Sequence, residues 1–337
     1  MKHPFDRRHA LRATAGLLGS AALPAWAQAT AAATPPYPSR PITLVVPFAP
    51  GGAVDASARA AAERLGKVLG QTIIVDNRGG AGGAIGSAFV AKAAPDGHTL
   101  VVTSQSTHVV NPAVTPNLSY NAEADFAPIT LIDRLANVLL VNADLPVKTF
   151  DEFVAYVRAN AGKWNYASSG NGSVAHLSME VLKANLGLAI AHVPYKGAGP
   201  ALTDLLAGAV QVTWNNLTSN LANITNGKLR ALAVASPQRV PQLPSVPTFD
   251  ELKLPELNLT SWTGLAAPAR TPESIVSRLY EGMRTVLADP ATKLAWEARG
   301  AMLPEAITPR QYKQEISQRI QFYRNLVKTH KIVLGSD

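Results

Sequence analysis

Hydrophobic positions near the start of the chain follow two different spacings in succession. Residues 42–46 (ITLVV) are a short apolar, β-branched run, and Pro47 ends it because proline cannot donate a hydrogen bond to a sheet. After Gly52, apolar residues recur at steps of three or four, which is typical of a helix face. These residues are Val54, Ala58, Ala62, Leu65 and Leu69. The stretch therefore predicts a strand, a proline- and glycine-containing loop, and a helix.

The same order of strand, loop and helix recurs along the chain. Further apolar segments predict strands at residues 72–75, 99–103, 138–141, 164–167, 189–193, 210–214 and 231–235. Such repeated units indicate an α/β fold with mainly parallel sheets covered by helices. Ligands bind such sheets beyond the carboxyl ends of the strands. An extended segment at 257–267 and three amphipathic helices after residue 271 complete the pattern, and we interpret these helices as scaffold.

The first 27 residues have the pattern of a bacterial export signal. Basic residues precede a small-residue apolar run at 13–23, and residues 25–27 (AWA) match a cleavage site. The Arg7-Arg8 pair resembles a twin-arginine signal, with general secretion as the alternative because Ala10 replaces the usual bulky apolar residue. Residues 28–38 predict a flexible tether. No later apolar run approaches the roughly 20 residues that span a bilayer.

Composition narrows the function classes. A chain of 337 residues favours two domains, and the absence of cysteine excludes disulfides, thiolate metal sites and cysteine nucleophiles. The formal charge of +8 falls to +5 without the signal, since residues 1–27 carry four basic residues and one acidic residue (8 − 4 + 1). The remaining basic residues are scattered among acidic ones, so the sequence gives little support to nucleic-acid binding.

The loop at residues 47–52 predicts a site for an anion. A glycine pair at a helix start leaves backbone N–H groups unobstructed, and the positive end of the helix dipole favours a carboxylate or phosphate. A plain strand-to-helix turn is the alternative. Asp55, in the first helical turn, fits two orientations: facing the pocket it would attract an ammonium group, and facing away it would leave a plain carboxylate as ligand. Lys196 and Arg78 are candidate cationic partners.

Motifs for cofactor chemistry and catalysis are absent from the sequence. The glycine loop at 79–83 fails the dinucleotide fingerprint because Ile85 stands where a third glycine is required, and no Walker sequence occurs. The histidines after the signal show no metal-ligand spacing. A Gly-x-Ser-x-Gly elbow is also missing, although Ser169 and His176 lie close in sequence and leave an exported serine hydrolase as the rival hypothesis. We therefore expect no cofactor, no metal and no enzymatic activity.

Small polar loops at strand ends instead predict ligand binding. Ser104, Ser168, Ser169 and Asn215 each follow a predicted strand, and they come from both halves of the chain. Hydroxyl and amide groups in such positions hydrogen-bond a ligand rather than transform it. Each of them alone is equally typical of an ordinary loop, so the prediction rests on their coincidence.

Seven further segments occur in order along nearly the whole chain after the signal. They are residues 46–55 (VPFAPGGAVD), 77–83 (NRGGAGG), 94–100 (APDGHTL), 125–129 (DFAPI), 165–172 (NYASSGNG), 192–197 (HVPYKG) and 245–248 (SVPT). Together they resemble the Bordetella-uptake-gene (Bug) type of extracytoplasmic solute-binding receptor, which serves tripartite tricarboxylate transporters. Ala49 and Gly79 replace common prolines of this family. Residues 214–216 (WNN) stand where many members carry an acid, a change that bears on ligand choice.

The resemblance implies a two-lobed periplasmic binding protein fold of type II that closes on its ligand. The implied division is lobe 1 at residues 39–140, lobe 2 at 141–261 and a return to lobe 1 at 262–337, with hinge crossings near Leu140 and Trp262. It implies a monomeric periplasmic receptor that captures a small carboxylate (a dicarboxylate, aromatic acid or amino acid) for the large and small membrane subunits of the transporter. A receptor that reports to a signalling partner is a further alternative.

In this family the ligand lies between the loop around residues 47–55 and the opposite loop around 168–173, held by backbone N–H groups, hydroxyls and bridging waters. Carried onto this chain with the polar strand ends, the expected ligand-binding residues are Phe48, Ala49, Gly51, Gly52, Ala53, Asp55, Ser104, Ser168, Ser169, Gly172, Ser173, His176, Tyr195 and Asn215.

Overall fold

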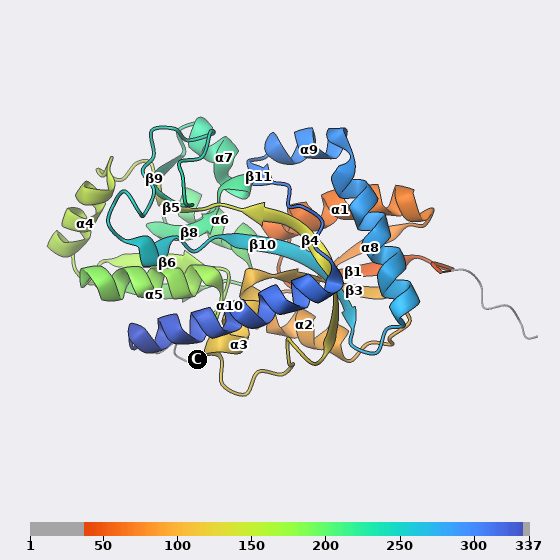
Figure 1. Cartoon of the computed structure of the whole chain (residues 1–337). Helices are drawn as coiled ribbons and strands as arrows, with labels where there is room; N and C mark the ends of the chain where they lie inside the picture. Colours follow the sequence, from red (N-terminus) through yellow and green to blue (C-terminus); the bar gives the residue numbers. More distant parts are fainter. Residues whose placement is uncertain (1–36, 333–337) are drawn as a thin grey trace, which may run out of the picture. The chain divides into compact units, whose positions relative to one another are not determined.

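Two β-sheets flanked by helices organise residues 37–332, the part of the chain that the computed structural model describes (Figure 1). The predicted export signal and nearly all of the predicted tether lie outside these residues. Both sheets belong to a single compact unit that begins at Pro38. Among the described residues, no helix combines the length and the apolar character that a membrane crossing requires.

The first sheet has six strands in the order β11-β4-β10-β3-β1-β2. Its members are β1 (Ile42–Val46), β2 (Ile73–Asn77), β3 (Thr99–Ser104), β4 (Phe126–Leu135), β10 (Ser261–Pro268) and β11 (Ala301–Met302). β1 pairs in parallel with β2 and β3, as repeated strand–loop–helix units predict. β10 runs antiparallel to β3 and β4, and β11 runs antiparallel to β4.

The second sheet has five strands in the order β7-β6-β8-β5-β9. They are β5 (Asn137–Asn142), β6 (Trp164–Ser168), β7 (Ile190–Pro194), β8 (Val212–Asn216) and β9 (Leu229–Ala235). β6 is parallel to β7 and β8, whereas β5 is antiparallel to β8 and β9. Each sheet is therefore mixed rather than mainly parallel, because strands next to the chain crossings run against the strand–loop–helix units.

Helices cover both sheets. We call the six-stranded sheet with its helices the first lobe and the five-stranded sheet with its helices the second lobe. The first lobe contains α1 (Ala53–Leu69), α2 (Ala84–Ala91), α3 (Asn111–Val114), α8 (Glu273–Ala288), α9 (Pro290–Glu297) and α10 (Pro309–Thr329), with the short turns η1 (Ala81–Gly83) and η2 (Ser106–Val110). The second contains α4 (Phe150–Ala159), α5 (Val174–Leu186), α6 (Ala198–Leu206), α7 (Leu217–Thr225) and η3 (Pro255–Leu257). In Figure 1, α8 lies beside α1, and α10 runs past α3.

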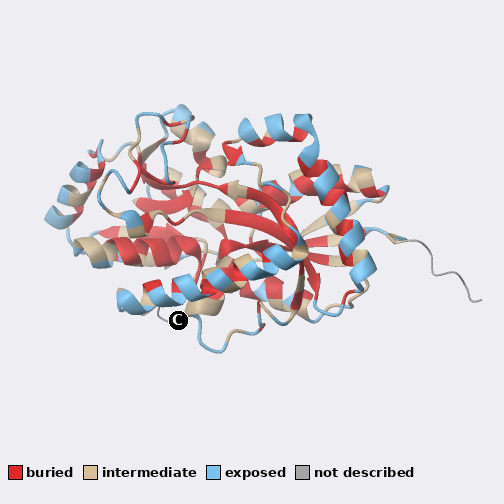
Figure 2. Cartoon of the chain, viewed as in Figure 1, coloured by how far each residue is buried: buried red, intermediate tan, exposed pale blue. Residues whose placement is uncertain are grey.

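Strand β5 lies at the centre of the core of the second lobe and is buried on both faces. All six residues of β5 are buried, and Figure 2 shows the strands as the buried interior beneath partly exposed helices. Val138 and Leu140 pack in one apolar cluster, while Leu139 and Val141 pack in another. Opposite faces of the strand thus enter different clusters, as the two-residue period of a strand requires. A continuous apolar run such as VLLV is typical of a strand covered on both faces.

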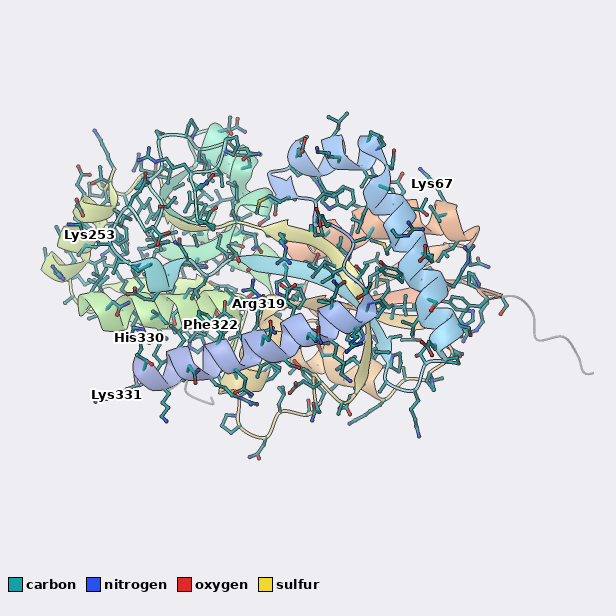
Figure 3. The ribbon with its side chains drawn as sticks, in the orientation of Figure 1. Lys67, Lys253, Arg319, Phe322, His330 and Lys331 are labelled. Carbon is teal, nitrogen blue, oxygen red and sulfur yellow. The ribbon has the colours of Figure 1, made fainter. Side chains whose placement is uncertain are left out.

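The outer faces of the helices carry the charged and exposed side chains. Figure 3 shows Arg319 and Phe322 on α10 and Lys67 on α1 at the outside of the molecule. Phe322 is half exposed, whereas Tyr312, Ile316 and Ile320 of the same helix are buried. One face of α10 is therefore its packing surface, in agreement with the prediction that the C-terminal helices are scaffold.

The chain passes from the first sheet to the second at Ala136, because β4 ends at Leu135 and β5 pairs over its whole length with β8 and β9. It returns between β9 and β10. The Asn137 side chain ties the two passages together, since its Nδ2 donates to the Leu259 carbonyl at 2.5 Å and to Ser261 Oγ at 3.0 Å. The division into lobes at residues 39–140, 141–261 and 262–337 stays a prediction, as do its hinges.

Candidate functional site

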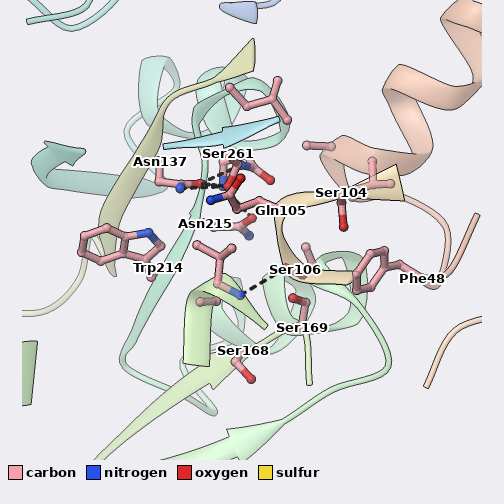
Figure 4. A pocket seen from close by; sticks show the side chains of 18 of the residues that line it. Phe48, Ser104, Gln105, Ser106, Asn137, Ser168, Ser169, Trp214, Asn215 and Ser261 are labelled. Carbon is pink, nitrogen blue, oxygen red and sulfur yellow. Dashed lines mark hydrogen bonds between the residues drawn. The ribbon is translucent and has the colours of Figure 1, made fainter. Parts of the chain in front are cut away.

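A cavity lies beyond the carboxyl ends of β1, β3, β6 and β8. Its lining comprises Phe48, Gly52, Ala53, Val54, Asp55, Ser104, Gln105, Ser106, Leu135, Asn137, Ser168, Ser169, Val174, Ala175, Ala198, Ala201, Thr213, Trp214, Asn215, Asn216, Ser261 and Trp262. Figure 4 shows Phe48 and Trp214 at opposite ends of this group, with serine and asparagine side chains between them.

Eight of the residues predicted to bind the ligand line this cavity. They are Phe48, Gly52, Ala53, Asp55, Ser104, Ser168, Ser169 and Asn215. The structure therefore brings together the first strand-to-helix loop with the polar ends of β3, β6 and β8, as the parallel arrangement of these strands predicts. The other six, Ala49, Gly51, Gly172, Ser173, His176 and Tyr195, lie next to the cavity but outside its lining.

Backbone contacts between the two lobes explain the position of Ala49. Its N–H donates to the carbonyl of Lys196 at 3.0 Å, which joins the loop after β1 to the loop after β7. A Cβ on Gly52 would lie 3.2 Å from the Cβ of Ala198, so this loop approaches α6 closely. Gly52 thus permits the close approach of the two lobes and also leaves the helix start open.

Helix α1 begins at the cavity without a side-chain cap. Its N-cap residue is Gly52, which has no side chain that could accept a hydrogen bond from the first turn. The first N–H groups of a helix lack intrahelical partners, and they carry the positive end of the helix dipole. Because Ala53 and Val54 both line the cavity, this first turn is the part of the first lobe best suited to receive an anion.

Asp55 is held by its own lobe. Its carboxylate accepts hydrogen bonds from the Gly51 N–H at 3.1 Å, from Arg59 Nε at 3.1 Å and from Asn77 Nδ2 at 2.9 Å. Asn77 Nδ2 also donates to the Phe48 carbonyl at 3.0 Å, so this network supports the whole loop. Burial raises the pKa of Asp55, but the hydrogen bonds from Arg59, Asn77 and Gly51 outweigh it and leave the pKa below its ordinary value.

The opposite loop, at residues 168–173, is supported by helix α5. Ser173 is the N-cap, and its Oγ accepts the His176 N–H at 3.3 Å. The N–H of Val174, the first residue of α5, donates to Ser106 Oγ of the first lobe at 3.1 Å, a bond drawn in Figure 4. His176 Nδ1 lies 3.2 Å from the Gly172 N–H and accepts from it. The start of α5 is therefore capped by protein groups, one of which comes from the other lobe.

A stack of three rings positions Ser168. The rings of Tyr166 and His192 are 4.7 Å apart, and those of His192 and His176 are 3.9 Å apart, with interplanar angles of 18° in both pairs. His192 Nε2 lies 2.6 Å from Ser168 Oγ, and that oxygen also accepts the Gly170 N–H at 3.1 Å. The serine that meets a histidine here is therefore Ser168, and the contacts of His176 point to a structural role in the loop.

Tyr195 contributes through its main chain. Its N–H donates to the Ser168 carbonyl at 3.1 Å, while its hydroxyl donates to Asp204 at 2.5 Å on α6. Burial and the neighbouring carboxylate raise the pKa of Tyr195 to about 12, so the phenol stays protonated. The phenol of Tyr195 is therefore bound to α6. Tyr195 supports the cavity only through its backbone, which holds Ser168 at the end of β6.

The cavity contains no basic side chain among the described residues that line it. Of the two candidate cations, Arg78 pairs with Asp76 at 2.7 Å and stacks over Phe89, while Lys196 is exposed. Asp55 is the one ionisable residue in this lining, and its carboxylate is already engaged. Neutral hydroxyl, amide and indole groups therefore set the chemistry of the site. Residues 37–332 also hold no cluster of acidic residues and histidines suited to a metal ion.

Several lining residues were not predicted. Gln105 and Ser106 follow Ser104 in the same loop, and Ala198 belongs to the glycine-containing turn at 197–199, so their neighbours already indicated them. Asn137, Ser261 and Trp262 are the first residues of β5 and β10, directly after the passages between the sheets. The sequence indicated these residues only through the hinge crossings expected near Leu140 and Trp262, because in a two-lobed fold such crossings border the cleft.

Residues 57–332 match the model of the tripartite tricarboxylate transporter family receptor, TctC. The chain belongs to this family. This membership, which covers most of the chain, confirms the resemblance read from the seven segments.

Solved structures agree with this assignment. The receptor is 35% identical to the periplasmic binding protein BugD, with a TM-score of 0.85 over 88% of this chain and 99% of BugD. It is 36% identical to MatC from Rhodopseudomonas palustris, solved with bound malate, with a TM-score of 0.83 over 86% and 100% of the two chains. It is 34% identical to R. palustris Rpa4515, solved with adipate, with a TM-score of 0.84 over 88% and 99%.

These neighbours confirm the two-lobed α/β fold of a periplasmic binding protein for this receptor. The family is one of solute-binding receptors, which is not a class of enzymes.

Proposed function

We propose that this receptor captures a small plain carboxylate in the periplasm and delivers it to the membrane subunits of a tripartite tricarboxylate transporter. The observation that carries the proposal is the cavity between the uncapped start of α1 and the polar ends of β3, β6 and β8. An anion enters this site without an arginine or lysine, held by helix N–H groups and by neutral hydroxyl and amide groups.

The network around Asp55 favours a plain carboxylate over an amino acid. An ammonium group needs acceptors, and the Asp55 carboxylate already accepts from Gly51, Arg59 and Asn77. The two related receptors solved with malate and adipate, both dicarboxylates, are consistent with this choice. The ligand class proposed here is therefore a small carboxylic acid without an amino group.

Closure of the two lobes is part of the proposal. The contacts between Ala49 and Lys196 and between Ser106 and Val174 join the two lobes. Hinges near the two passages between the sheets would let these contacts open and reform as the ligand enters. A closed receptor with its ligand would then be the form that the transporter recognises.

The test is ligand binding by the protein purified without its predicted signal. A panel of mono- and dicarboxylates is screened by thermal shift and then by calorimetry, with the methyl esters of the same acids as neutral controls. At least one acid should raise the melting temperature in a concentration-dependent way, since a ligand that binds only the folded state stabilises it by mass action. Thermal shifts absent across the whole panel would contradict the proposal.

A pair of variants connects binding to the predicted loop. Gly52→Leu places a large side chain against Ala198 and should abolish binding while the fold is retained, as checked by circular dichroism. Ala56→Leu adds the same side chain on an exposed position of α1 outside the lining and should bind as the unaltered protein does. Equal affinities of the two variants would show that this loop is not the binding site.

A further inference from the structure

One hydroxyl in the cavity connects the two lobes and keeps a donor of its own. Ser106, the first residue of η2, lines the cavity and is partly exposed, unlike its buried neighbours Ser104 and Gln105. Its Oγ accepts the Val174 N–H of the second lobe at 3.1 Å. A serine hydroxyl has one O–H donor in addition to its lone pairs. Among the described residues, no group accepts the O–H of Ser106, so the protein does not use this donor.

We propose that the Ser106 hydroxyl donates to a carboxylate oxygen of the ligand while it accepts from Val174, and that this relay couples ligand binding to closure of the lobes. The inference rests on the proposed function, since it concerns the same cavity. Ser106 is then a ligand contact of the first lobe whose strength depends on the second.

Other serine hydroxyls of the lining are engaged within their own lobes. Ser104 Oγ lies 3.1 Å from Thr107 Oγ1, and Ser168 Oγ lies 2.6 Å from His192 Nε2. The bond of Ser106 crosses from one lobe to the other instead. In Figure 4 the dashed line that ends at Ser106 lies between Trp214 and Phe48, in the middle of the residues that line the cavity.

The partner of Ser106 makes its hydroxyl a stronger donor. Val174 is the first residue of α5, and the N–H groups at a helix start carry the positive end of the helix dipole. A hydroxyl that accepts from such a group is polarised, so its own O–H forms a stronger hydrogen bond to an anion. The positive end of α5 thus acts on the ligand through Ser106, although protein groups already cap this helix.

The bond between Ser106 and Val174 depends on the two lobes being together, since the residues are 68 positions apart and belong to different lobes. A ligand shifts a conformational equilibrium by the difference between its affinities for the two states. A carboxylate that binds the polarised hydroxyl more tightly than the unpolarised one therefore favours closure. By the same linkage, closure raises the affinity for the carboxylate.

Proline at position 174 removes the N–H without breaking the helix. Val174 is the first helical position, where proline is well tolerated because its missing N–H has no intrahelical acceptor. Ser173 before it has φ −75° and ψ 162°, the extended backbone that a following proline requires. Val174→Pro therefore removes the group that Ser106 accepts. Val174→Ala is the matched control, because it shortens the same side chain and keeps the N–H.

Calorimetry measures the affinities of a panel of mono- and dicarboxylates that includes butyrate, succinate, malate and adipate. The variants are Ser106→Ala, Val174→Pro, Val174→Ala and Ser178→Ala, the last a buried serine of α5 outside the lining. For the acid that binds the unaltered protein most tightly, Ser106→Ala should lose about 10- to 100-fold in affinity and Val174→Pro about 3- to 10-fold. Val174→Ala should lose less than Val174→Pro, and Ser178→Ala should bind as the unaltered protein does.

The double variant Ser106→Ala/Val174→Pro tests the relay itself. It should lose little more affinity than Ser106→Ala alone, because the Val174 N–H acts on the ligand only through the hydroxyl. Small-angle X-ray scattering then measures closure at saturating concentrations of the same acid. The acid should reduce the radius of gyration of the unaltered protein and of Ser178→Ala, and reduce it less in Ser106→Ala and Val174→Pro.

Unchanged affinity of Ser106→Ala, or equal losses in Val174→Pro and Val174→Ala, would overturn this inference while the proposed function stands. The same conclusion follows if Ser106→Ala loses affinity but closes as fully as the unaltered protein. Should Ser106→Ala fail to fold, as checked by circular dichroism, the comparison of Val174→Pro with Val174→Ala decides alone. No binding of any acid of the panel to the unaltered protein overturns both proposals.

Discussion

Helices α1 and α5 both begin at the cavity, but their first turns are completed in different ways. α1 has Gly52 at its N-cap and no side-chain cap, while α5 has Ser173, the Ser106 hydroxyl of the other lobe and the His176 ring around its start. Two helix ends with the same dipole therefore differ in whether their first N–H groups are free to bind a ligand. The one without a cap can receive an anion, and the other already has its hydrogen-bond acceptors from the protein.

The supports behind the two loops differ as well. The loop before α1 is held by an ionic network of Asp55, Arg59 and Asn77, whereas the loop before α5 is held by stacked rings and a hydroxyl. Neither support places a cation in the cavity. Charge at this site therefore shapes a loop, and the lining of the cavity presents neutral polar groups.

Completing α1 with its own acceptor should have the largest effect. Gly52→Asp supplies a carboxylate at the N-cap, which would occupy the N–H groups of the first turn and repel a carboxylate ligand. We expect a loss of affinity of at least about 100-fold, because like charges placed together cost several kcal/mol. Calorimetry with the best ligand of the carboxylate panel measures the change.

Gly52→Asn is the matched control, since it caps the helix and fills the same space without a charge. It should bind more weakly than the unaltered protein and more tightly than Gly52→Asp. If Gly52→Asp binds the acid with unchanged affinity, α1 is not where the carboxylate lies, and the difference between the two helix starts has no functional meaning.

The ionic support of the first loop should be visible in the pH dependence of stability. The pKa of Asp55 in the folded protein lies below its ordinary value of 3.8, so the unfolded chain binds the proton first as the pH falls. The contribution of Asp55 to stability is therefore complete above about pH 5 and is lost as the pH falls through the ordinary and then the lowered pKa. We expect Asp55→Asn to reduce the free energy of unfolding by about 1–2 kcal/mol at pH 7, since Arg59 is half exposed and its charge is partly screened.

Urea denaturation between pH 7 and pH 3 checks this expectation. The curves of Asp55→Asn and the unaltered protein should run parallel from pH 7 to about pH 5 and converge below the ordinary pKa of an aspartate. A difference that grows as the pH falls would mean that the carboxylate is destabilising, contrary to the hydrogen bonds observed around it.

Local patterns in the sequence predicted the strand-end half of the site. The run at 42–46, the proline after it and the helical spacing after Gly52 are short-range signals, and the parallel pairing of β1 with β3 then brings Ser104 beside the first loop. The same holds for Ser168 and Asn215, which lie at the carboxyl ends of the parallel strands β6 and β8. Strand-end loops are predictable because one rule of sheet geometry collects them at one edge.

The other half of the site depends on pairings between distant segments. β4 was not predicted, because Pro128, Thr130 and Asp133 interrupt its apolar pattern, yet it is a long strand paired with β10 on one side and β11 on the other. Asn137 reaches the cavity through its bonds to Leu259 and Ser261, more than 120 residues away along the chain. No local spacing encodes such contacts, so Trp262 was expected at a hinge and not in the lining.

The smallest effect should come from removing the cap of α5. Ser173 is fully buried and accepts the His176 N–H, so Ser173→Ala should lower the free energy of unfolding by about 1 kcal/mol, the usual contribution of a serine cap. Ligand affinity should change by less than about twofold, since Ser173 lies outside the lining of the cavity. Thr308→Ala, which removes the cap of α10 at another helix start outside that lining, is the control and should show a similar loss of stability with unchanged binding. A tenfold loss of affinity confined to Ser173→Ala would instead make Ser173 a ligand contact, as the family resemblance implies, and would place both helix starts in contact with the ligand.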